Sequence, residues 1–446
     1  MTTTTGTTDT LTAATPKAAP HPLRAEAVRG FPPLAGAALM VACGAMMIAT
    51  AREWQGDWAE TAGQLHDGLL MALPVAAAAG CWHGGRERRR RTEELWGTAV
   101  RPPLARLLAS AVPVALWTAV GYLLVLAAAN VATWPYARGD HPHLILVPGD
   151  TAALMAAVLL GHVVGRIVPS LLAAPLLGVA GFAGLAAAVP EADVQPLDPA
   201  SFTVHGSWPV WWQPLAMTAW TLGLALALTL AYAARRRATA LLPLAAALTG
   251  AALLVQGGDA TWQPDPFLRR QVCDTSTTPA ICVNARYGGV LPQVTTALSG
   301  VTGRLKGVKG LPVRWADREH GPRADEAQLP ILAPVGWSLV RGRLVDPHQY
   351  AYEAAAMLSD RGQCERASER VTFAVDAVQS YLAPSPGRGA FDAIEAKGDA
   401  AARAHLRASL AARAKLAGMD EERRKVWLSA YFAARATCDD EGVPSL

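Results

Sequence analysis

The fold class is decided by residues 151–189, which read TAALMAAVLLGHVVGRIVPSLLAAPLLGVAGFAGLAAAV. Only Arg166 carries a full charge in this stretch. Pro169 and Ser170 divide the stretch into two apolar blocks, and a helix needs about 20 apolar residues to cross the hydrocarbon core of a bilayer. We therefore expect two membrane-spanning helices joined in a tight hairpin.

Five further apolar blocks lie on either side of this hairpin. Only 17% of the chain is charged, against about a quarter in an ordinary soluble protein. No block has the polar face that a buried helix of a soluble protein normally shows. The sequence predicts an all-α, polytopic membrane domain over 31–256 with about seven spans. The spans are expected near residues 31–50, 65–82, 104–129, 151–168, 171–189, 214–234 and 238–256.

The interiors of these blocks are expected to contain no Asp, Glu or Lys, with Asp67 at a block end. Ionisable groups inside a membrane usually mark proton relays or ion-coupled transport, so a carrier driven by protons or Na⁺ is not expected. His162 is the one titratable side chain expected well inside a span. We interpret it as a hydrogen-bonding contact with a neighbouring helix, and a gating or substrate contact is the alternative.

The distribution of Lys and Arg predicts the orientation. With the N-terminus inside, the outer connectors hold only Arg52 and Arg138. Because cytoplasmic loops are enriched in Lys and Arg, we expect a multi-pass protein of the cell membrane with an inner N-terminus and an extracytoplasmic C-terminal domain. Residues 1–30 are expected to be a disordered cytoplasmic tail. A signal peptide cleaved near Ala49-Thr50-Ala51 is the alternative, although its apolar run exceeds a usual signal core.

Residues 257–446 have the mixed charge of a water-exposed domain, predicted to be a small α+β part followed by mostly helical structure. Helices are expected at Gly288–Arg304, Tyr350–Asp360, Glu365–Tyr381, Ala390–Ala417 and Glu421–Cys438.

The cysteines give a further indication of compartment. Four of them lie in the C-terminal domain, and oxidised pairs persist outside the cytosol. Three pairings are possible, of which we favour Cys273–Cys282, which closes a short loop, and Cys364–Cys438, which would brace the helices. Cys43 and Cys81 lie in spans and are expected to be inert thiols.

Motifs for catalysis or metal binding are weak. The charged run 317–326 and the pair His141 and His143 lack a defined ligand spacing, and neither His-Glu-x-x-His nor Gly-x-Ser-x-Gly occurs. We expect no enzyme activity and no bound metal, and we interpret the C-terminal domain as a binding or assembly module.

The loop between the second and third spans has a distinctive order of residues. It reads GGRERRRRTEELWGTAVRPPLARLL over residues 84–108. A loop that only binds anionic lipid would explain the arginines, but not the acidic pair, the apolar tip or the two prolines. The basic run is followed by a helix cap, two acids suited to a helix N-terminus and an apolar tip. These residues are Arg91, Thr92, Glu93, Glu94, Leu95 and Trp96.

This loop resembles that of the permease subunits of type 2 ABC transporters, an export class whose ATPase is usually a separate chain. In that family an Arg-rich stretch precedes a Thr-x-Glu-x-Leu-like motif and a proline-containing return into the membrane. Arg88–Arg91, Thr92–Leu95 and Arg101–Leu108 match this pattern. The tight hairpin and a six-span core over about residues 31–234 are also similar. The resemblance implies a coupling helix that contacts the ATPase through Glu93, Glu94, Leu95 and Trp96.

The resemblance also implies the partners: an ABC ATPase subunit, a second permease in a homo- or heterodimer, and the lipid bilayer, with no nucleic acid. The chain has no Gly-x-x-x-x-Gly-Lys-Ser/Thr loop, so ATP would be bound by the ATPase subunit and the chain itself needs no cofactor. A seventh span and the C-terminal domain depart from the family pattern. The alternative function is a non-transporting anchor that displays a receptor or envelope-assembly domain.

Overall fold

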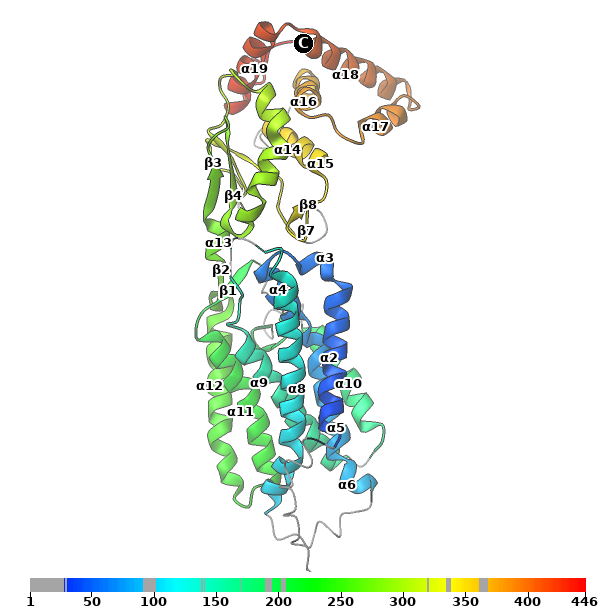
Figure 1. Ribbon diagram of the computed structural model, residues 1–446, viewed down its shortest axis with the longest axis vertical. Coiled ribbons are helices and arrows are strands. Elements are labelled where there is room, and N and C mark those ends of the chain that lie inside the picture. Colours follow the sequence, from blue (N-terminus) through cyan, green and yellow to red (C-terminus); the bar gives the residue numbers. More distant parts are fainter. Residues whose placement is uncertain are drawn as a thin grey trace, which may run out of the picture.

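The computed structural model describes residues 28, 30–90, 102–137, 139, 141–168, 170–188, 195–201, 206–318, 321–333, 338–360 and 368–446. These residues are mostly helical, and they form a bundle of long helices that carries the C-terminal domain at one end (Figure 1). We call this end of the bundle the domain end and the opposite one the far end.

The bundle contains eight helices of ten or more residues among the described residues. They are α2 (Pro32–Ala49), α4 (Trp58–Asp67), α5 (Leu69–Gly84), α8 (Pro103–Thr133), α9 (Val147–Ile167), α10 (Ala173–Ala188), α11 (Gln213–Ala233) and α12 (Leu241–Gly257). Short turns join them: α3 (Ala51–Trp54), α6 (Arg86–Arg89), η1 (Gln195–Leu197), η2 (Arg237–Ala240) and η3 (Gly258–Thr261).

Five helices in the described ranges are long and apolar enough to cross a membrane, or six when the bent pair α4 and α5 is taken as one span. That pair is bent by 41° and replaces the straight span expected at 65–82. The block expected at 171–189 forms α10, which has 16 residues. Such a helix is about 24 Å long, shorter than the roughly 30 Å hydrocarbon core. Length and composition therefore support a helical membrane protein with five or six candidate spans.

Contacts between helix ends show that the chain reverses direction along the bundle. The hydroxyl oxygen of Thr61, at the start of α4, lies 2.7 Å from that of Thr133, at the end of α8. Glu87, which follows α5, pairs with Arg166 near the end of α9 at the far end. Strands β1 (Ser207–Pro209) and β2 (Trp262–Pro264), which flank α11 and α12, pair at the domain end.

A seam of glycines brings α5 and α9 into close contact. A Cβ atom on Gly80 would lie 2.2 Å from the carbonyl oxygen of Val158, and one on Gly161 would lie 2.0 Å from that of Ala77. Gly165 meets α5 in the same way. Small residues allow helices in lipid to pack by close van der Waals contact. The Gly161-x-x-x-Gly165 pattern therefore packs within the chain.

The C-terminal domain begins with a four-stranded sheet in the order β3-β4-β5-β6. The strands are β3 (Gln271–Asp274), β4 (Ala280–Asn284), β5 (Arg314–Ala316) and β6 (Glu326–Gln328). The first pair is antiparallel and the other two pairs are parallel. The smaller elements are α13 (Pro266–Arg269), η4 (Ala285–Val290), β7 (Leu339–Val340) and β8 (Arg343–Leu344).

Six helices complete this domain: α14 (Leu291–Arg304), α15 (Pro347–Asp360), α16 (Glu369–Leu382), α17 (Arg388–Glu395), α18 (Ala400–Gly418) and α19 (Glu421–Ala436). Five of them, all except α17, contribute apolar residues to one core that includes the fully buried Trp315 of β5 and Tyr431 of α19. The single helix expected over Ala390–Ala417 is wrong, because Asp399 caps a new helix by accepting a hydrogen bond from Ala402 N–H.

Candidate functional site

A polar network lies buried where α4, α8 and α9 meet. His66 Nδ1 lies 2.9 Å from Asp150 Oδ1, and the Tyr122 hydroxyl donates to Asp150 Oδ2 at 2.6 Å. All three residues are less than a tenth exposed. Because hydrogen bonds are strong where water is excluded, Asp150 ties three helices together through one carboxylate.

The sequence did not predict this network. The fourth span was expected to begin at Thr151, whereas α9 begins at Val147 and carries Asp150 in its first turn. The block expected at 151–168 contains no acid, but the earlier helix start brings Asp150, together with His66 of α4, into the bundle as titratable groups besides His162. Pro148 is the signal that could have located the helix start, because proline is favoured in the first turn of a helix.

A small cavity, which we call the polar chamber, adjoins the network. Its volume is about 10 Å³, room for roughly one water molecule. Three atoms of its lining residues are buried without a hydrogen-bond partner in the described part of the chain: His66 Nε2, Asp198 Oδ2 and Gln213 Oε1. The other oxygen of Asp198 accepts from Ala200 N–H at 2.8 Å, which holds the carboxylate in place.

An apolar groove of about 420 Å³ lies along the same helices, about one turn further from the domain end. On α9, Asp150 lines the chamber and Ala153 lines the groove. On α11, Met217 lines the chamber and Trp220 lines the groove. Pro199 lines both spaces. Helix α10 supplies one wall with Leu177, Ala180, Gly181, Gly184 and Leu185.

Helix α10 lies at the periphery of the bundle and packs mainly on α5. Ala174 is the only residue of α10 that is buried. A Cβ atom on Gly184 would meet no other atom within 4 Å. The groove is therefore bounded by three firmly packed helices and one peripheral helix.

At the far end of the bundle, the predicted coupling residues Arg91, Thr92, Glu93, Glu94, Leu95 and Trp96 lie outside the described residues. The structure describes both flanks of the loop, where α6 follows α5 and Pro103 begins α8. Glu87 of α6 accepts from Arg166 Nη2 at 2.6 Å, so the start of the loop is attached to α9.

His162 is fully buried in the far half of α9. Its Nε2 atom lies 3.0 Å from Ser110 Oγ of α8. This side chain therefore makes an interhelical hydrogen bond, and Arg166 Nε also reaches His162 Nε2 at 3.4 Å.

A buried ionic cluster, which we call the docking cluster, fixes the C-terminal domain to the bundle. Asp57 caps α4 by accepting from Glu60 N–H. Arg286 of η4 donates from Nε to Asp57 Oδ2 and from Nη2 to Glu60 Oε1, both at 2.6 Å. Desolvation is the largest single effect and would lower the pKa of Arg286, but attraction to Asp57, Tyr287 and Glu60 and the hydrogen bond to Asp57 together outweigh it, so the pKa lies well above the ordinary value. Arg286 therefore stays charged while buried.

Close backbone contacts accompany the docking cluster. Gly56 has φ +120°, and a Cβ atom there would lie 2.5 Å from the backbone nitrogen of Gly342. Positive φ and lack of space both require glycine at this position. Arg341 Nε also donates to Gln55 Oε1 at 2.7 Å. The linker between α3 and α4 is thus pressed against the C-terminal domain.

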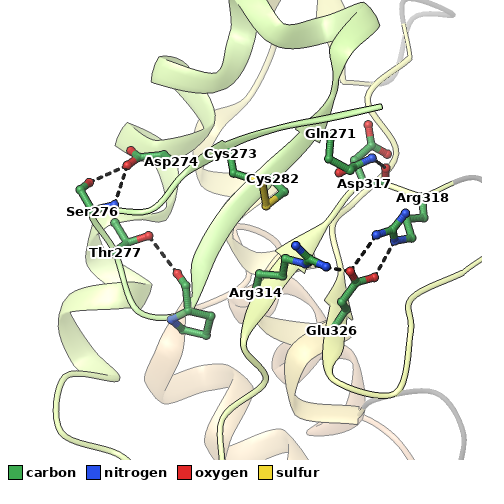
Figure 2. Close-up of a disulfide and its surroundings, with 11 residues drawn as sticks. Gln271, Cys273, Asp274, Ser276, Thr277, Cys282, Arg314, Asp317, Arg318 and Glu326 are labelled. Carbon is green, nitrogen blue, oxygen red and sulfur yellow. Dashed lines mark hydrogen bonds and ion pairs between the residues drawn. A yellow bond between two sulfur atoms is a disulfide. The ribbon is translucent and has the colours of Figure 1, made fainter. Parts of the chain in front are cut away.

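A disulfide joins Cys273 of β3 to Cys282 of β4 (Figure 2). The two cysteines face each other in the strand register. Cys438 is also disulfide-bonded, and Cys364 lies outside the described residues. Cys43 and Cys81 are free and buried in the bundle.

The described residues of the charged run, 317–318 and 321–326, form hydrogen bonds and ion pairs on the sheet. Arg318 and Arg314 flank Glu326 and lower the pKa of its carboxyl to about 2 (Figure 2). Burial raises the pKa of Asp317 to about 7 even though Asn284 donates to it. Within the described ranges, no group of three or more His, Cys, Asp or Glu residues could hold a metal ion.

No protein-family model, curated protein or solved structure matches this chain.

Proposed function

We propose that this chain is the membrane-spanning permease subunit of an ATP-driven exporter, coupled to a separate ABC ATPase through residues 84–108. In this proposal the chain crosses the membrane seven times, with α10 as a short crossing, and the C-terminal domain is extracytoplasmic. The positive-inside distribution supports this orientation. Arg86, Arg88 and Arg89 of α6 and Arg237 of η2 lie in connections between helices at the far end, opposite the C-terminal domain.

The observation that carries the proposal is a continuous mechanical connection along the bundle. The bent pair α4 and α5 begins at the docking cluster and ends at α6, where the loop starts. Its far end is held to α9 by the glycine seam and by Glu87–Arg166. Packed helices transmit a shift as near-rigid units, so a movement imposed on the loop would reach Arg286 and the C-terminal domain.

The test is affinity purification of the tagged full chain in mild detergent, followed by identification of co-purifying proteins and an ATP-hydrolysis assay. Wild type is compared with Glu94→Arg in the loop and with Glu53→Arg, a matched charge reversal at the domain end. We expect a nucleotide-binding subunit with wild type and Glu53→Arg, and its loss or uncoupling with Glu94→Arg. Absence of any ATPase across several detergents would contradict the proposal and favour the non-transporting anchor.

A further inference from the structure

Acids are the only charged side chains besides His66 among the described residues that line the polar chamber. They are Asp150 and Asp198, and no described Lys or Arg lines the chamber or the groove. Asp150 is hydrogen-bonded to His66 and Tyr122, whereas Asp198 accepts from Ala200 N–H through one oxygen and leaves Oδ2 without a partner. A buried carboxyl must be neutralised by a proton or by a cation, so a cation that donates hydrogen bonds suits the chamber.

The open atoms of the chamber also specify the hydrogen bonding. Asp198 Oδ2 and Gln213 Oε1 are acceptors. His66 Nε2 is a third acceptor when its Nδ1–H donates to Asp150, an orientation that their 2.9 Å separation allows. A primary ammonium group presents three N–H donors and is about the size of the one water molecule for which the chamber has room.

The apolar lining of the groove indicates that the rest of the ligand is apolar. The groove begins about one helical turn from the chamber, with Pro199 lining both spaces, and it runs along α5, α9 and α11. Alanines, leucines and glycines dominate its lining. Its volume of about 420 Å³ lies in the usual range for small-molecule sites. A phosphate or carboxylate head would set a negative charge beside Asp150 and Asp198, which disfavours phospholipids and fatty acids as occupants.

We propose that the polar chamber and the apolar groove together bind a single-chain amphiphile with a primary ammonium head. The ammonium donates to Asp198 Oδ2 and Gln213 Oε1, and the aliphatic chain lies in the groove against α10. The chain enters beside α10, the peripheral helix that forms one wall of the groove. This binding site goes beyond the coupling to an ATPase and stands or falls separately from it.

Binding of dodecylamine, dodecanol and dodecanoic acid to the full chain in phosphatidylcholine nanodiscs tests this proposal, because the three probes share a tail and differ in the head. We expect one saturable site that prefers the amine at least tenfold over the other two. Asp198→Asn should reduce amine binding about tenfold and leave dodecanol binding unchanged, since an asparagine oxygen can still accept from Ala200 N–H. Asp259→Asn, a matched change at an exposed position, should have no effect.

A second variant tests the groove. Gly184→Phe places a ring where the structure has open space, and it should weaken dodecylamine and dodecanol alike. Measurements on the wild-type chain alone can overturn the proposal. They would do so if the three probes bound equally, if the acid bound best, or if no saturable binding were seen. An amine preference that survives Asp198→Asn would show that the head does not bind in the chamber. None of these measurements requires an ATPase partner.

Discussion

Replacement of Arg286 by methionine should release the C-terminal domain from the bundle. The side chain of Arg286 is 3% exposed, and those of Asp57 and Glu60 are 1% and 10% exposed. The substitution removes the cation and leaves both carboxylates buried. Breaking a buried ion pair by removal of one partner costs about 3–5 kcal/mol, and we expect the docked state to lose that amount.

The loss should depend on pH. In the variant, the carboxyls of the docked state must take up protons, whereas those of the undocked state have ordinary pKa values near 4. The docked state then binds more protons, so the loss grows as pH rises from 5 to 8. The slope is about 1.4 kcal/mol per pH unit for each carboxyl that stays protonated.

Hydrogen–deuterium exchange of the full chain in nanodiscs measures this opening. Peptides that cover η4 should exchange at least a hundredfold faster in Arg286→Met at pH 7, because 3 kcal/mol corresponds to a factor of about 150. Arg343→Met, at an exposed position of β8, serves as the control. The neutral triple variant Asp57→Asn, Glu60→Gln and Arg286→Met should recover most of the protection. Unchanged exchange in Arg286→Met, or a loss independent of pH, would refute this account of docking.

Three further predictions concern other parts of the chain. Gly161→Ala should lower the thermal stability of the bundle by about 1–3 kcal/mol, because its Cβ would lie 2.0 Å from Ala77 O and force α5 and α9 apart. Asp317→Asn should remove a pH dependence from the C-terminal domain. The buried carboxyl has a pKa of about 7 against about 4 when unfolded, so rising pH destabilises the wild type by up to about 4 kcal/mol, fully above pH 7. Cys273→Ser should cost about 3 kcal/mol of C-terminal domain stability by freeing a loop with a sequence separation of 9.

Each of these predictions can be contradicted by one measurement. Gly184→Ala should leave the unfolding temperature in detergent unchanged, and equal stability of Gly161→Ala would rule out the seam. For Asp317→Asn, the free energy of unfolding is measured with denaturant from pH 4 to 8. If the variant kept the pH dependence of the wild type, a group other than Asp317 would be its source. For Cys273, a membrane-impermeant maleimide applied to reduced intact cells also reports orientation. Labelling only after lysis would place the C-terminal domain inside and contradict the proposed topology.

Helix formation in this chain depends on local features, and these can be recognised in the sequence. Apolar runs of about 20 residues indicate α2, α8, α9, α11 and α12, because a helix satisfies its backbone hydrogen bonds within its own segment. Asp420, an acid directly before the helix expected at Glu421–Cys438, caps α19 by accepting from Arg423 N–H. Asp150, in contrast, was not expected in a helix, because the predicted start of the fourth span lies four residues after the observed one.

The candidate site depends on residues far apart in the sequence. His66 meets Asp150 across 84 residues, and Arg286 meets Asp57 across 229. Neither pair leaves a local pattern, since any buried acid needs a partner and the sequence does not say which one. The sequence alone determined that long apolar helices precede a water-exposed domain. A segment in hydrocarbon must be apolar and about 20 residues long, whereas a domain in water carries mixed charge. Only the tertiary structure decided which polar groups meet between those helices, because helix packing selects the partners.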